Sequence, residues 1–234
     1  MPYKDLKIIY IHGIDGGPHS TKGNALAKVW PNTIIPDMSK FLFPLAHLIA
    51  IYILCCIGLN ITICIFIQYL LNYSLIFTIP MSCWMSTCIT YYLGSIYLSR
   101  ALNRCEKLIL TFIDKIKPDI IVATSWGSAV IYRLIIRNHW SGPVVMLSPA
   151  VKTIFFFCNY YLFPPPSHFR GPIHMIHGAD DIIISPESSQ EFYNMLIQNC
   201  ETELAIIPNE PHSLRGITDS LPNVVINCWT EVEN

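Results

Sequence analysis

Residues 121–134 read IVATSWGSAVIYRL, and their pattern changes in the middle. The first residues are apolar and mostly β-branched, as in a buried strand, whereas the residues after Gly127 follow a helical pattern. Between these two parts lies a short turn, TSWG, whose glycine tolerates a tight bend. The stretch therefore predicts a strand, a sharp turn and a helix, with Ser125 in the turn.

Strand and helix patterns alternate along most of the chain. The predicted strands comprise residues 7–12, 33–36, 119–124, 144–147, 173–177 and 203–207, and the predicted helices comprise residues 20–30, 99–116, 127–138, 186–199 and 221–229. Apolar strands that alternate with helices are typical of a parallel sheet with helices on both faces. We therefore predict an α/β fold, whose ligands should bind beyond the carboxyl ends of the strands.

The composition narrows the classes of partner. The formal net charge is −1, which does not favour a nucleic-acid partner. The nine cysteines include no C-x-x-C pair and no metal-ligand spacing, so we interpret them as apolar side chains in a reducing compartment. Neither a metal nor a cofactor is expected, and the oligomeric state is left open. The N-terminal residues do not resemble a secretory signal.

Ser125 has two interpretations. A serine hydroxyl becomes a nucleophile when a neighbouring base takes its proton, and that base needs an orienting carboxylate. Small residues two positions before and after such a serine let strand and helix approach each other, and Ala123 and Gly127 meet this need. Alternatively, the serine only caps the helix that follows it. Residues at the other predicted strand ends decide between these interpretations.

Five short motifs at the strand ends resemble the α/β-hydrolase superfamily, and most of all its small bacterial-type serine esterases. The motifs are YIHG at residues 10–13, ATSWG at 123–127, LSPAV at 147–151, HGADD at 177–181 and PHS at 211–213. They occur in the order that the family has and span most of the chain, apart from one apolar insertion. The resemblance implies the α/β-hydrolase fold and hydrolysis of a carboxylic ester or thioester.

The resemblance also implies a catalytic triad. Ser125 matches the nucleophile of the family, Asp181 matches its acid and His212 matches its base. Asp180 stays open as an alternative acid, because the assignment rests on spacing from the glycine at this strand end. Superfamily members that have lost catalysis keep the fold. The alternative function is therefore a membrane-anchored scaffold or binding protein with an inactive triad.

Other groups near the strand ends would complete the site. The backbone N–H groups of Ile14 and Trp126 match the two donors that stabilise the developing oxyanion. Asp15 either lines the site or shapes the turn in which it lies. Three histidines lack metal-ligand spacing, and we interpret them as packing or loop-orienting residues: His12, His174 and His177.

Residues 41–99 contain no Asp, Glu, Lys or Arg. A membrane-spanning helix needs about 20 residues, so this length allows two, with a polar bend at residues 72–74 between them. Both ends return to one sheet, and a hairpin is the simplest path that does so. We predict an α/β-hydrolase domain of residues 1–40 and 100–234, interrupted by a hydrophobic hairpin of residues 41–99 that spans a membrane or is embedded in it.

Positive charges flank this insertion on both sides. Lys28 and Lys40 precede it, and Arg100, Arg104 and Lys107 follow it. This excess is typical of the cytoplasmic side of a membrane, so we expect a membrane-associated protein whose catalytic domain faces the cytoplasm. The alternative is a lid that packs on the domain or on a second copy. Helices that are apolar all round favour lipid or a large core over such a lid.

A second apolar stretch follows the motif at residues 147–151. It contains FFF at residues 155–157 and YYLF at residues 160–163. It lies where the fold often carries a cap over the nucleophile, so its aromatic residues could form an acyl pocket, enter the membrane interface or simply pack under a loop. Together with the hairpin, it suggests an apolar or lipid-like acyl ester as the substrate.

Overall fold

The computed structural model describes residues 5–42, 45–71 and 75–231 of the chain. The strands are β1 (Ile8–Ile11), β2 (Ile120–Thr124), β3 (Val144–Leu147), β4 (Ile173–Gly178) and β5 (Thr202–Ile207). The helices are α1 (Thr21–Val29), η2 (Ser39–Phe41, a 3-10 helix), α2 (Leu45–Leu71), α3 (Leu75–Ile116), α4 (Trp126–Ile136), α5 (Val151–Phe157), α6 (Pro186–Leu196) and α7 (Leu221–Thr230).

The strands form one parallel sheet in the order β1-β2-β3-β4-β5. The first four strands are almost completely buried because helices cover both faces, whereas β5 at the edge is partly exposed. This burial explains why the first four strands are apolar in nearly every position. The predicted α/β class with a parallel sheet is therefore confirmed.

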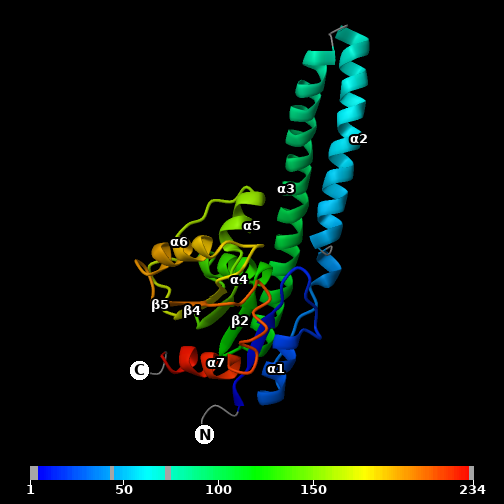
Figure 1. The fold of residues 1–234 in the computed structure, drawn as a ribbon. Helices are drawn as coiled ribbons and strands as arrows, with labels where there is room; N and C mark the ends of the chain where they lie inside the picture. Colours follow the sequence, from blue (N-terminus) through cyan, green and yellow to red (C-terminus); the bar gives the residue numbers. More distant parts are fainter. Residues whose placement is uncertain (1–4, 43–44, 72–74, 232–234) are drawn as a thin grey trace.

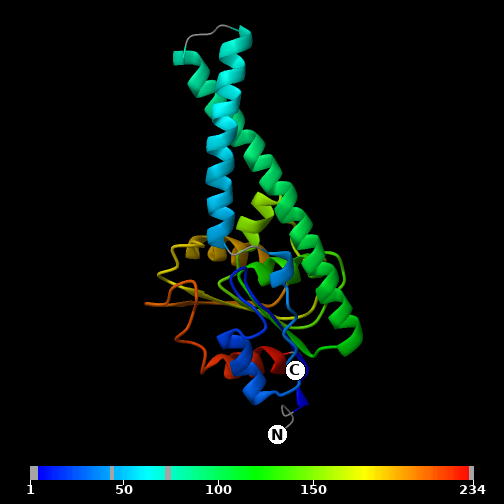
Figure 2. The same ribbon diagram turned by 90° about the vertical axis from the view of Figure 1, so that its right-hand side faces the viewer.

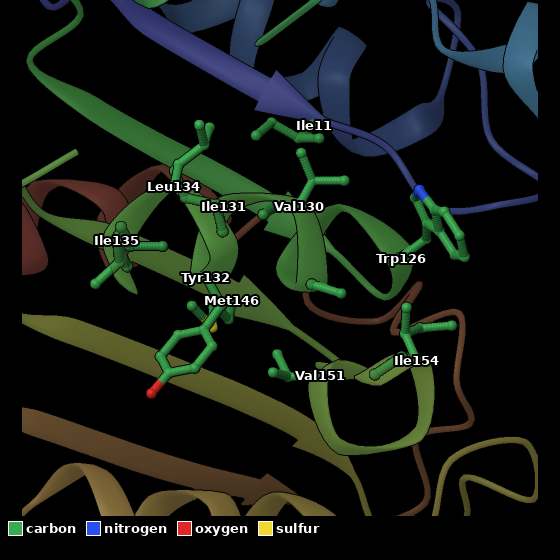
Figure 3. Close-up of a cluster of buried hydrophobic side chains, with 14 of the residues drawn as sticks. Ile11, Trp126, Val130, Ile131, Tyr132, Leu134, Ile135, Met146, Val151 and Ile154 are labelled. Carbon is green, nitrogen blue, oxygen red and sulfur yellow. The ribbon is translucent and has the colours of Figure 1, made fainter. Parts of the chain in front are cut away.

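Two groups of helices cover the two faces of the sheet (Figure 1). The second half of α3 packs with α4, α5 and α6 on one face, and α1 and α7 pack on the other. Alternate residues of β1 serve the two cores, Ile9 and Ile11 on the first face and Ile8 and Tyr10 on the second. Figure 3 shows the first core, in which side chains of α4 and α5 meet residues of β1 and β3.

The predicted strand at residues 33–36 is wrong. Only Ile34 pairs with the sheet, through a single parallel bridge to Ile9. Pro36 has no N–H group with which to extend the pairing, and the N–H of Thr33 is used in a turn that bonds to the Trp30 carbonyl. Ile34 and β2 lie on opposite edges of β1, so the chain changes its winding direction at β1, where ligand sites of such sheets form.

α2 and α3 extend together far beyond the sheet (Figures 1 and 2). The helix predicted at residues 99–116 is the second half of α3, a single helix of 42 residues. The proposed boundary between hairpin and domain, after residue 99, therefore falls inside a continuous helix. The bend predicted at residues 72–74 lies outside the described residues.

The side chains of the hairpin have the reverse of the distribution found in water-soluble helices. Ser82, Ser86 and Thr90 follow one face of α3 and are buried, and the Ser82 hydroxyl donates to the Asn60 side-chain oxygen of α2 at 2.9 Å. The large apolar side chains that are exposed include Ile51, Leu54, Ile57, Ile61, Ile65, Phe66, Trp84, Ile89, Tyr92 and Leu93. Small polar residues between helices and apolar residues outside are typical of helix pairs in lipid.

One helical segment in the described part of the chain is long and apolar enough to cross a membrane. It comprises Ala50–Tyr69 within α2, with a mean hydropathy of 2.5 over its most apolar part. Only 6% of that window is buried in the structure, so this segment is not the core helix of a packed domain. By length and composition it is therefore a candidate membrane span.

Charge as well as packing holds the second half of α3 to α4. The Glu106 carboxylate of α3 lies 3.1 Å from the Nε of Arg133 on α4 and 2.8 Å from the Nη1 of Arg137, the residue that follows α4. Glu106 and Arg133 are buried, and the Arg133 guanidinium also lies 4.4 Å from the centre of the Tyr160 ring. The helix that leaves the hairpin is thus fixed to the helix that follows Ser125.

Candidate active site

Ser125 occupies the turn between β2 and α4, as its sequence pattern predicts. Its backbone has φ 52° and ψ −111°, a conformation that non-glycine residues rarely adopt and that is often found at functional sites. The side chain of Ser125 makes no capping hydrogen bond to α4. The structure therefore does not support the interpretation of this serine as a helix cap.

Gly127 allows this turn to form. A Cβ atom at this position would lie 2.3 Å from the carbonyl oxygen of Ile11, which is too close for any real contact. We expect Gly127→Ala to destabilise the protein by about 1–3 kcal/mol, because backbone atoms of β1 would have to move. Gly17→Ala is the matched control, since a Cβ at Gly17 meets nothing within 4 Å. Thermal unfolding in detergent measures both, and equal melting temperatures would contradict this account.

The structure brings Ser125, His212 and Asp181 together. The Ser125 hydroxyl lies 3.0 Å from the Nε2 of His212, and the Nδ1 of His212 lies 2.6 Å from the Oδ2 of Asp181. Because a carboxylate only accepts hydrogen bonds, the Nδ1 of His212 carries the proton and Nε2 is left to accept one from Ser125. Asp180 is exposed, and its backbone N–H donates to the Glu210 carbonyl.

Further donors surround the buried carboxylate of Asp181. Its Oδ1 accepts hydrogen bonds from the backbone N–H groups of Ile183 and Ile184, each at 2.9 Å. The Nε2 of His177 lies 2.9 Å from both the Oδ2 of Asp181 and the Ile184 carbonyl oxygen. Both neighbours are acceptors, so this nitrogen carries a proton, and Nδ1 accepts from the Ser189 hydroxyl at 2.7 Å. His177 thus orients Asp181 and its loop.

The loop after β1 lies directly against the serine. A Cβ built on Gly13 would lie 3.3 Å from the Cβ of Ser125, so Ile14, the next residue, begins beside the nucleophile turn. Trp126 is the first residue of α4, where backbone N–H groups have no acceptor within the helix. The N–H groups of Ile14 and Trp126 therefore belong to the two segments that border Ser125.

His12 holds this loop in place. Its Nδ1 donates to the Gly13 carbonyl at 2.8 Å, and its Nε2 accepts from the backbone N–H of Met38 at 3.1 Å. Burial lowers the pKa of His12, despite opposing hydrogen bonds and the nearby charge of Asp37. A neutral imidazole suits this arrangement because one ring nitrogen donates and the other accepts.

Two polar side chains hold the backbone beside His212, and the sequence did not predict this role for either, although Ser148 lies in the strand-end motif at residues 147–151. The Ser148 hydroxyl donates to the His212 carbonyl at 3.0 Å, and the Lys22 ammonium of α1 donates to the carbonyl of Ser213. Burial lowers the pKa of Lys22 to about 8, although the charge of Glu210 opposes this effect. A sequence signal for Lys22 exists, because Lys22 and the buried Leu26 lie four residues apart on one helix face.

His174 forms a separate cluster with two carboxylates. Its Nε2 lies 2.7 Å from the Oε2 of Glu231, and its Nδ1 lies 3.7 Å from the Oε2 of Glu203. These three residues could offer ligands to a metal ion. However, the carboxylates face different ring nitrogens, whereas one metal ion would bind only one of them. The cluster is better explained as a polar link between β4, β5 and the C-terminal end of α7.

Comparisons with known proteins agree with this architecture. No protein-family model and no curated protein sequence matches the chain. Among solved structures, MGS-MChE2, an alpha/beta hydrolase enzyme from a sediment metagenome of the Mar Chica lagoon, has a TM-score of 0.57 at 10% identity, over 98% of this chain and 93% of that one.

Two further structures are similar over nearly the whole chain. Est1E from Butyrivibrio proteoclasticus has a TM-score of 0.53 at 12% identity, covering 97% of this chain and 88% of that one. A serine hydrolase homologue from Coxiella burnetii has a TM-score of 0.51 at 9% identity, covering 94% and 83%. At such low identity the likeness concerns the fold. This chain has the α/β-hydrolase fold.

Proposed function

We propose that this protein is a serine hydrolase that cleaves a carboxylic ester or thioester. In this proposal Ser125 is the nucleophile, His212 is the general base and Asp181 orients the imidazole. The observation that carries it is the continuous chain of hydrogen bonds from Asp181 through His212 to Ser125, at 2.6 and 3.0 Å. Structural neighbours that are named as hydrolases support the same class of activity.

The reaction would proceed through an acyl-enzyme. The Nε2 of His212 takes the proton of Ser125 while its oxygen attacks the carbonyl carbon, and Asp181 stabilises the imidazolium that forms. The N–H groups of Ile14 and Trp126 would donate to the developing oxyanion, each contributing about 3 kcal/mol. His212 then protonates the leaving alcohol or thiol. A water molecule, deprotonated by His212, finally releases the acid and restores Ser125.

A fluorophosphonate probe tests this proposal directly. The probe phosphonylates an activated serine, so peptide mapping should find the label on Ser125. Folded protein that stays unlabelled would favour the inactive scaffold instead. A series of p-nitrophenyl esters and acyl thioesters then defines the substrate. We expect turnover to increase with acyl-chain length, and a preference for short chains would contradict an apolar or lipid-like substrate.

We further propose that residues 41–99 anchor the hydrolase domain, residues 1–40 and 100–234, to the cytoplasmic side of a membrane. The apolar exterior and polar interior of the α2–α3 pair support this proposal, as does the length of Ala50–Tyr69. The positive charges on both flanks support the orientation. A soluble lid would need a polar outer face, and the exposed side chains of α2 are mostly apolar.

Charges placed on the outer face of α2 test the anchor. Ile57 and Ile61 are exposed and lie within Ala50–Tyr69. Each lysine near the centre of a bilayer costs about 3 kcal/mol, so the double variant Ile57→Lys/Ile61→Lys should lose much of its membrane fraction. Alkaline carbonate extraction measures this fraction. The matched control is Val29→Lys/Ile197→Lys, which places lysines at exposed apolar positions at the ends of α1 and α6, helices that cover the sheet. Release of the unaltered protein by carbonate would contradict an integral anchor.

A further inference from the structure

The aromatic residues after β3 divide into a buried and an exposed set. Phe155 is buried against Tyr132 and Tyr160, with ring centroids 6.0 and 6.2 Å away. Four others are exposed and form what we call the aromatic patch: Phe156 at 66%, Phe157 at 43%, Tyr161 at 81% and Phe163 at 59%. The rings of Phe156 and Phe157 lie 5.5 Å apart, and those of Tyr161 and Phe163 lie 6.1 Å apart.

The stretch of sequence that carries this patch contains no charged residue. No Asp, Glu, Lys or Arg occurs between Lys152 and Arg170. Scattered apolar side chains are normal on a protein surface, but several large rings grouped together usually mark an interaction site. Tyr161 and Phe163 line a hollow of about 280 Å³ with Arg133 and Arg137, but none of Ser125, Asp181 and His212 lines it. This hollow therefore does not support the acyl-pocket interpretation, because an acyl pocket must open onto the nucleophile.

α5, which carries Phe156 and Phe157, lies beside α3 at the foot of the hairpin (Figures 1 and 2). The Tyr91 hydroxyl donates to the Phe156 carbonyl at 3.3 Å, and the Tyr91 ring lies 6.4 and 6.5 Å from the rings of Phe156 and Phe157. About two turns further along α3, the Ser99 hydroxyl donates to the Cys158 carbonyl at 3.0 Å. Phe156 and Phe157 are thus level with the part of α3 where the apolar hairpin begins.

We propose that the aromatic patch is a second membrane contact, in which its rings enter the headgroup region of the bilayer that the hairpin crosses. This proposal rests on the membrane location proposed above. Aromatic side chains concentrate at this depth because their rings are apolar but tolerate polar neighbours. Tyr92 and Leu93 of α3 are also exposed, next to Tyr91, whose ring contacts Phe156 and Phe157.

The contact would determine how substrate reaches the site. α5, which carries Phe156 and Phe157, begins at Val151, and the preceding N–H of Ala150 donates to the Ser125 carbonyl at 3.4 Å. A seven-residue helix is about 10 Å long, so the patch and the nucleophile turn are one short helix apart. An acyl ester whose chain lies in the bilayer therefore fits this geometry better than an ester dissolved in water.

Tryptophan quenching tests this proposal in the full-length protein, reconstituted into phosphatidylcholine vesicles. The variants Phe156→Trp and Tyr161→Trp add one fluorophore each to the five native tryptophans. We expect the added emission to be lost when the vesicles contain lipids brominated near the headgroup, and to be lost less with bromines near the chain end. Val29→Trp, on α1 at the opposite face of the sheet, should keep its added emission.

Two results would overturn the proposal. Emission from the added tryptophans that is no more quenched than that of Val29→Trp would place the patch outside the lipid. A dimer in detergent that Phe156→Glu dissociates would assign the patch to a second copy of the chain. Carbonate extraction of the same vesicles distinguishes failure of the patch proposal from failure of the anchor proposal. Protein that resists extraction without quenching contradicts only the patch, whereas protein that is extracted contradicts the anchor itself.

Discussion

Ser125→Ala is expected to lower ester turnover by about a thousandfold or more, with little change in the stability of the fold. The variant removes the proposed nucleophile, the hydroxyl that lies 3.0 Å from the Nε2 of His212. Alanine keeps the Cβ atom and the same backbone restrictions, so the turn at φ 52° should form as before. The loss would therefore report chemistry and not misfolding.

Steady-state turnover of a p-nitrophenyl ester measures this effect, alongside fluorophosphonate labelling. Ser128→Ala is the matched control, because Ser128 lies three residues away and its hydroxyl bonds to the Ala123 carbonyl at 3.3 Å. We expect this control to keep both turnover and labelling. Wild-type turnover in Ser125→Ala would exclude Ser125 as the nucleophile, whatever the geometry of its neighbours.

Asp181→Asn is expected to lower turnover by on the order of a thousandfold or more, a loss similar in kind to that of other triad acids. Three groups donate to this carboxylate, the Nδ1 of His212 and the N–H groups of Ile183 and Ile184, and the Nε2 of His177, which donates to the Ile184 carbonyl, lies 2.9 Å from it as well. An amide has only one oxygen, so its NH2 group must face two of these donors. Either His212 takes the wrong tautomer, or the loop loses its hydrogen bonds.

Asp180→Asn provides the comparison within the same loop. Asp180 is exposed, and Asp181 is the neighbour that meets the Nδ1 of His212. We expect Asp180→Asn to keep turnover within about twofold of the unaltered protein, since exposed substitutions usually have small effects. A large loss in Asp180→Asn together with a small loss in Asp181→Asn would reverse the assignment of the acid. The measurement is the pH profile of ester turnover for both variants.

Most of the strands and helices could be predicted from local sequence patterns. β3 has the predicted boundaries, and most other elements agree within a few residues, because buried strands and amphipathic helices carry their own periodicity. The segment at residues 33–36 has a strand-like composition, but Pro36 cannot donate to a neighbouring strand. The continuity of α3 was also missed, since nothing in its helical pattern marks where the sheet ends and the hairpin begins.

In the candidate site, too, local features could be predicted and features that depend on tertiary contacts could not. The turn around Ser125 could be predicted because a strand, a glycine and a helix follow one another within a few residues. The sequence predicted a packing or loop-orienting role for His177, but its contacts, like those of Lys22, depend on which loops meet in space: His177 reaches the carbonyl of Ile184 and Lys22 reaches that of Ser213. Similarly, the inward direction of Ser82, Ser86 and Thr90 follows only from the pairing of α2 with α3.

In the proposed membrane arrangement, the unbroken helix α3 is a rigid connection between the bilayer and the candidate active site. The C-terminal half of α3 is fixed to α4 through Glu106 and Arg133, and α4 begins at the residue after Ser125. Each residue of a helix adds about 1.5 Å and turns the chain by about 100°. In that proposed arrangement, the number of residues in α3 therefore sets both the height of Ser125 above the lipid and the direction in which Ser125 faces. Deleting one residue near position 95 would rotate the domain by about 100° about the axis of α3. Deleting seven residues, about two turns, would shorten the helix by about 10 Å and leave the orientation of the domain nearly unchanged.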